Sequence, residues 1–68
     1  MRVKEFVKRV KRLDPEACVD VTKGKGGHIT IFANGHRSVL PALDKDMQQG
    51  VICEALRRLR IEKKDFVQ

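Results

Sequence analysis

A histidine behind a glycine- and lysine-rich segment is the part of this sequence best suited to chemistry. The segment reads Lys23-Gly24-Lys25-Gly26-Gly27-His28 and runs directly into Ile29-Thr30-Ile31-Phe32. Histidine exchanges protons near neutral pH because its ordinary pKa is about 6.5. Glycines let the backbone approach a ligand closely, and lysines attract anions. The combination indicates action on an anion such as a phosphodiester.

Cleavage of RNA without a metal sets requirements that His28 can meet in part. The 2′-hydroxyl needs a base and the departing 5′-oxygen needs an acid, and one histidine can take one of these roles. Lys23 or Lys25 could stabilise the charge that develops on the phosphorane, and the glycine N–H groups could face a phosphate. The alternatives are an ordinary polar residue at a strand start and a flexible loop. The residues alone leave these alternatives open.

Hydrophobic spacing predicts the elements that must position this segment. Apolar residues at helical spacing predict one helix over residues 3–13, ending before Asp14-Pro15, and another over residues 50–59. Residues 17–21 are expected to form a first strand. The glycine pattern matches no nucleotide-binding motif and precedes a strand rather than a helix, which disfavours a nucleotide cofactor.

A hairpin is predicted from residues 29–33 and 37–40, joined by the turn signal Asn34-Gly35. A two-residue turn fixes which residues share a face of the sheet. The face expected under the helices carries Ile29, Ile31, Ala33 and Leu40. The uncovered face is expected to carry His28, Thr30, Phe32, Arg37 and Val39. A turn longer by one residue would exchange the two faces.

The aromatic and basic residues of the uncovered face fit a nucleic acid. Phe32 could stack on a base while Arg37 holds a phosphate. The same pair could also be a patch for a protein partner, or an exposed aromatic ring with an arginine lying over it. The basic residues of the first helix could bind an anionic partner, or they could form an ordinary solvated surface.

Size and composition limit the possible functions. The 68 residues predict a single domain over residues 1–68, and 15 Lys and Arg against 9 Asp and Glu give a formal charge of +6. This charge favours a nucleic acid, an acidic protein or an anionic membrane surface. No apolar run is long enough for a signal peptide or a membrane span, so we expect a cytoplasmic protein.

The histidines and cysteines have no metal-ligand spacing, so we expect neither a metal nor another cofactor. Cys18 and Cys53 lie far apart in the sequence, and no Cys-x-x-Cys is present. Buried free thiols are the expectation for both, and a single disulfide is the alternative.

The chain resembles the HicA toxins, small mRNA interferases of toxin–antitoxin pairs, over nearly its whole length. The resemblance runs through Val3-Lys4-Glu5-Phe6, Lys25-Gly26-Gly27-His28, the segment from Gly35 to Pro41, and the helix 50–59 with Ile61 and Phe66 behind it. It implies an α+β fold like that of double-stranded-RNA-binding domains. In this fold, of order α-β-β-β-α, two helices pack on one face of a three-stranded antiparallel sheet.

The resemblance also implies a function. The family cleaves mRNA without a metal, is silenced by a HicB antitoxin, and carries a catalytic histidine that falls on His28. Gly27 departs from the family pattern, because a serine or asparagine usually stands there. The sequence therefore predicts an endoribonuclease toxin with His28 as general acid or base. Its RNA-binding residues would be Lys23, Lys25, Gly26, Gly27, Thr30, Phe32 and Arg37. The alternatives are a non-catalytic RNA-binding module and a domain that binds an acidic protein.

Overall fold

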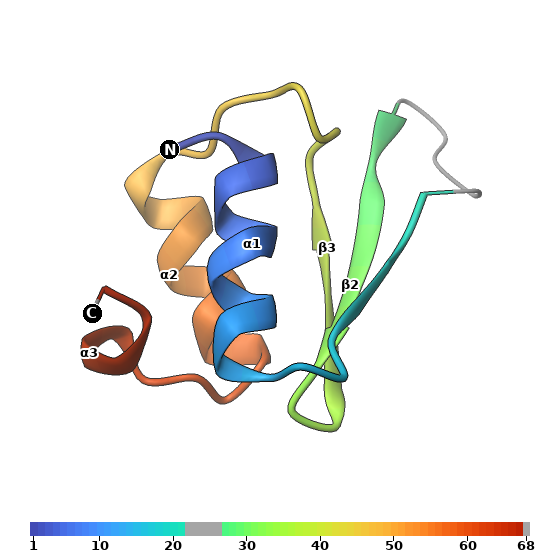
Figure 1. The fold of residues 1–68 in the computed structure, drawn as a ribbon. Coiled ribbons are helices and arrows are strands. Elements are labelled where there is room, and N and C mark those ends of the chain that lie inside the picture. The colour runs from blue at the N-terminus through green and yellow to red at the C-terminus, as the bar shows by residue number, and fades with distance from the viewer. Residues whose placement is uncertain (22–26, 68) are drawn as a thin grey trace.

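Helices on one side and a sheet on the other make up the fold (Figure 1). The structure is a computed structural model, and it describes residues 1–21 and 27–67. Its elements are α1 (Val3–Leu13), β1 (Cys18–Asp20), β2 (Ile29–Ala33), β3 (His36–Leu40), α2 (Gln49–Arg58) and α3 (Lys63–Phe66). The expected α+β fold with the order α-β-β-β-α is confirmed, and one short helix follows it. None of the helices described has the length and apolar character that crossing a membrane requires.

The sheet is antiparallel, and β2 lies between β1 and β3. In the hairpin, Ile29 pairs with Leu40 and Ala33 pairs with His36. The turn residues Asn34 and Gly35 have φ values of 54° and 76°, the left-handed conformation that this type of turn requires. The predicted turn, register and assignment of faces are therefore confirmed.

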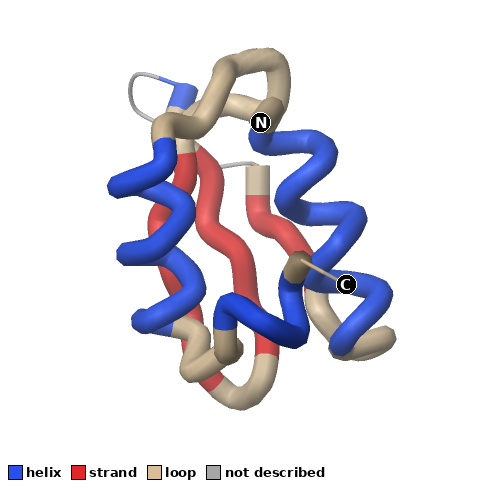
Figure 2. Tube along the Cα trace, turned by 90° about the vertical axis from the view of Figure 1, so that its left-hand side faces the viewer, coloured by secondary structure: helices blue, strands red, loops and turns tan. Residues whose placement is uncertain are grey.

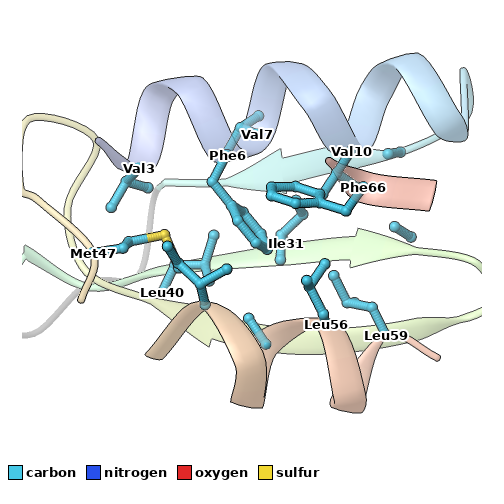
Figure 3. Packing of buried hydrophobic residues seen from close by; sticks show 14 of the residues in the cluster. Val3, Phe6, Val7, Val10, Ile31, Leu40, Met47, Leu56, Leu59 and Phe66 are labelled. Atoms are coloured by element: carbon cyan, nitrogen blue, oxygen red, sulfur yellow. The ribbon is translucent and has the colours of Figure 1, made fainter. Parts of the chain in front are cut away.

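Both long helices cover one face of the sheet, as the view turned by 90° shows (Figure 2). The buried core between the layers draws on all three helices, β2 and β3, and the half-buried Val19 of β1 packs against it; Figure 3 shows the main side chains of the core. Ile31 and Leu40 at its centre are fully buried, as are Phe6 and Val10 of α1. No helix of the described residues lies over the opposite face of the sheet.

The helix α3 exists because its last residue joins this core. Phe66 is 3% exposed, and its ring centroid lies 5.1 Å from that of Phe6. The guanidinium carbon of Arg9 lies 5.7 Å from the centre of the Phe66 ring. A four-residue helix is unstable by itself, so the docking of Phe66 holds it in place.

The expected burial of the two thiols is wrong. Cys18 and Cys53 are free, and both are exposed. Cys18 lies on β1 opposite Phe32, on the face of the sheet that the helices leave uncovered. Cys53 lies on the outer side of α2, where its Sγ accepts a hydrogen bond from Gln49 Nε2 at 3.7 Å.

The tip of the hairpin is fastened to the ends of both long helices. The Asn34 backbone N–H donates to Asp14 Oδ2, just past the end of α1, at 2.8 Å. The Asn34 side-chain amide donates to the carbonyl of Leu59 at 3.0 Å and to that of Arg60 at 3.2 Å, just past α2. These bonds fix the turn end of the sheet relative to both helices.

Candidate nucleic-acid interface

The uncovered face of the sheet carries two rows of side chains that run across all three strands. Cross-strand pairing aligns one row as Cys18, Phe32 and Arg37, and the other as Asp20, Thr30 and Val39. Phe32 is 37% exposed and Val39 is 63% exposed. The face therefore combines apolar surface with an arginine, as a surface that stacks bases requires.

His28 lies at one end of this face, directly before β2. Side chains alternate along a strand, and the next residue, Ile29, is buried beneath the sheet at 5% exposure. Extending this alternation by one residue before the strand puts His28 on the same side as Thr30 and Phe32, and His28 is exposed. Phe32 is the fourth residue after His28, which corresponds to about 13 Å along the strand.

The structure gives a physical reason for the glycine beside this histidine. Gly27 has a φ of 80°, which lies in the left-handed region that disfavours residues with a side chain. A Cβ atom placed there would lie 3.5 Å from the Cβ of Ala42, an ordinary contact distance. The backbone conformation, rather than a lack of space, therefore favours glycine at this position.

The described part of the predicted site comprises Gly27, His28, Thr30, Phe32 and Arg37. The other three predicted residues, Lys23, Lys25 and Gly26, lie outside the described residues. Cross-strand pairing adds two residues to this face that sequence reasoning missed, Cys18 and Asp20. The sequence predicts a strand over residues 17–21, but it does not fix the register of β1 against β2, which decides the face on which these two residues lie.

The cations of the described residues lie mainly on the helices. Among the residues in the two rows, only Arg37 is a cation, and Asp20 is an anion. The outer face of α1 carries exposed cations, namely Lys4, Lys8, Lys11 and Arg12. A second basic region lies at the end of α2, on the side of the hairpin tip.

This second region forms an open cleft that sequence reasoning missed. The cleft has a volume of about 1410 Å³ and lies between the hairpin tip and the end of α2. We call it the arginine cleft, and its arginines are Arg37, Arg57, Arg58 and Arg60. The sequence places these arginines at a helix C-terminus, where cations suit the helix dipole. Only the folded chain brings the hairpin tip beside them.

Arg60 occupies a backbone position that usually belongs to glycine. Its φ is 58°, in a helix-ending motif in which Ile61 N–H donates to Leu56 O at 2.9 Å and Arg60 N–H donates to Arg57 O at 3.2 Å. Glycine is the common residue at this point of the motif. A left-handed conformation costs other residues about 1–2 kcal/mol.

Comparison with known proteins gives no match to a family model, a curated protein or a solved structure.

Proposed function

We propose that this chain is an endoribonuclease toxin of the HicA type that cleaves mRNA without a metal or other cofactor. The observation that carries the proposal is the place of His28. It is an exposed histidine at the end of an uncovered sheet face that also presents Phe32 and Arg37. The resemblance to the HicA family supplies the reaction, and a HicB-like antitoxin would be the protein partner.

In this proposal the RNA lies on the uncovered face with one phosphodiester beside His28. The 2′-oxygen loses its proton and attacks phosphorus, and the bond from phosphorus to the 5′-oxygen breaks. The 5′-oxygen takes up a proton, so the products are a 2′,3′-cyclic phosphate and a 5′-hydroxyl. His28 either accepts the first proton or donates the second. Arg37 holds a neighbouring phosphate and Phe32 stacks on a base.

A growth assay with three forms of the protein tests the role of His28. Cells that express the wild-type chain should stop growing, whereas cells that express His28→Ala or His28→Gln should grow. Glutamine keeps hydrogen-bonding groups but cannot transfer a proton near neutral pH. Because His28 is exposed, neither variant should unfold the domain, and urea unfolding checks this. Growth arrest by either variant at wild-type strength would contradict the assignment.

RNA incubated with purified protein separates this function from its closest rival. The wild-type chain should produce fragments with cyclic phosphate ends, and added imidazole should restore part of the activity of His28→Ala. A non-catalytic RNA-binding module would leave the RNA intact while still binding it in a salt-sensitive way.

The native thiols report where RNA binds. Cys18 lies on the uncovered face in the same row as Phe32, whereas Cys53 lies on α2, on the other side of the sheet, and both are exposed. Bound RNA should slow the alkylation of Cys18 in the His28→Ala protein more than that of Cys53. Equal protection of both thiols would argue against binding on the sheet face.

A further inference from the structure

The arginine cleft continues the uncovered sheet face beyond the hairpin tip. Phe32 and Arg37 belong to the cross-strand row on the sheet, and they also line the cleft. Arg57 and Arg58 of α2 and Arg60 just past its end also line the cleft. A chain lying along β2 from His28 would therefore reach the cleft without leaving the surface.

The arginine at position 60 is not required by the fold. Its φ of 58° is a conformation that glycine adopts at no steric cost, and glycine is the usual residue there. An arginine at this position is strained, yet it adds a guanidinium group to a cleft that already holds three.

Several cations of the cleft are available to a ligand. Glu54 is paired with Arg58 at 3.1 Å, and Asp14 accepts hydrogen bonds from backbone N–H groups. Glu16 is the remaining carboxylate that lines the cleft. Within the ranges that the structure describes, three of the arginines form no ion pair, namely Arg37, Arg57 and Arg60.

We infer that the arginine cleft binds the phosphates of single-stranded RNA, as a second contact region for the strand that reaches His28. The inference rests on the proposed function and extends it. Guanidinium groups bind phosphate oxygens in pairs, and an aromatic ring beside a basic groove is typical of single-strand binding. The ring of Phe32, which lines the cleft, favours RNA over an acidic polypeptide.

The length of β2 sets the distance between the two regions. His28 and Phe32 lie about 13 Å apart along the strand, a distance that only a few nucleotides of an extended single strand would span. The cleft should therefore hold the backbone a few nucleotides from the bond that is cleaved. RNAs that end closer to that bond should gain nothing from it.

Binding of labelled RNA to the His28→Ala protein tests the inference without cleavage. The probe is a single-stranded RNA of about 12 nucleotides, within the site sizes of small single-strand binders, and fluorescence anisotropy is measured at several salt concentrations. In this background, Arg57→Gln and Arg60→Gly should each weaken binding about three- to tenfold. Each variant should also make the binding constant less dependent on salt: the slope of its logarithm against the logarithm of the salt concentration should be smaller in magnitude by about 0.7.

A stability measurement and a charge-matched control make the result specific. Arg60→Gly should unfold at the same urea concentration as its parent or a higher one, because glycine removes the backbone strain. Weaker binding by this variant is then not caused by unfolding. Lys8→Gln removes one charge from the outer face of α1, where Lys8 is exposed, and it should change RNA affinity less than twofold.

Several outcomes would overturn the inference. One is unchanged affinity of both arginine variants, and another is an equal loss with Lys8→Gln, which would report net charge only. A third is displacement of the RNA by poly-glutamate at equal charge concentration, which would assign the cleft to an acidic polypeptide. If any one of these outcomes occurs while the wild-type chain still cleaves RNA, only the assignment of the cleft fails. If binding depends on the cleft but no RNA is cleaved, the proposed nuclease function fails instead.

Discussion

Replacing Asn34 with alanine should remove much of the stability of the domain. The change deletes the side-chain amide that donates to Leu59 O and Arg60 O. Two such bonds contribute about 1–3 kcal/mol in total. Alanine at a φ of 54° costs about 1 kcal/mol more, because asparagine tolerates this conformation better. We expect the free energy of unfolding to fall by about 3 kcal/mol, from a total of about 3–5 kcal/mol for a domain of this size.

Urea unfolding followed by circular dichroism measures this loss. With a slope near 1 kcal/mol per molar urea for a small protein, the midpoint should fall by about 2–3 M. Asn34→Gly is the matched control, because it lacks the amide but adopts a positive φ freely, and it should lose about 1 kcal/mol less. If Asn34→Ala unfolds within about 0.5 kcal/mol of the wild type, the hairpin tip does not depend on these bonds.

Two further predictions concern the two faces of the sheet and the glycine beside the histidine. Ile31 is fully buried, so Ile31→Ala should lower the free energy of unfolding by about 2–5 kcal/mol. Thr30 lies on the other face, and Thr30→Ala should change this free energy by less than about 1 kcal/mol. Equal losses of the two variants in urea unfolding would contradict the assignment of faces. Gly27→Val should cost more stability than Gly27→Asn, because asparagine accepts the φ of 80° better than a β-branched residue does. Urea unfolding of the two Gly27 variants checks this prediction, and equal stability of the two would refute it.

The hairpin and the two long helices could be predicted from the sequence because their signals are local. Asn34-Gly35 specifies a two-residue turn, and the alternation of apolar residues then fixes the register and both faces. The side of the sheet on which His28 lies follows from these signals. The features that lack a local signal could not be predicted in this way.

Three features depend on contacts between distant segments. The helix α3 is too short for periodicity to reveal, and it is held by the packing of Phe66 on Phe6. The exposure of Cys18 depends on the register of β1 against β2, which no turn signal fixes. The arginine cleft needs the hairpin tip beside the end of α2, and the hydrogen bonds of Asn34 bring these segments together.

The hydrogen bonds of Asn34 also have a consequence for the rates of folding and unfolding. They join residues 20, 25 and 26 positions apart in the chain, whereas the helices and the hairpin form from neighbouring residues. We expect bonds that need such distant segments to be in place to form after the transition state for folding. The side-chain bonds of Asn34 should therefore hardly affect how fast the chain folds. They should instead set how long the folded molecule persists, because their loss would speed unfolding and shorten the lifetime of the native state.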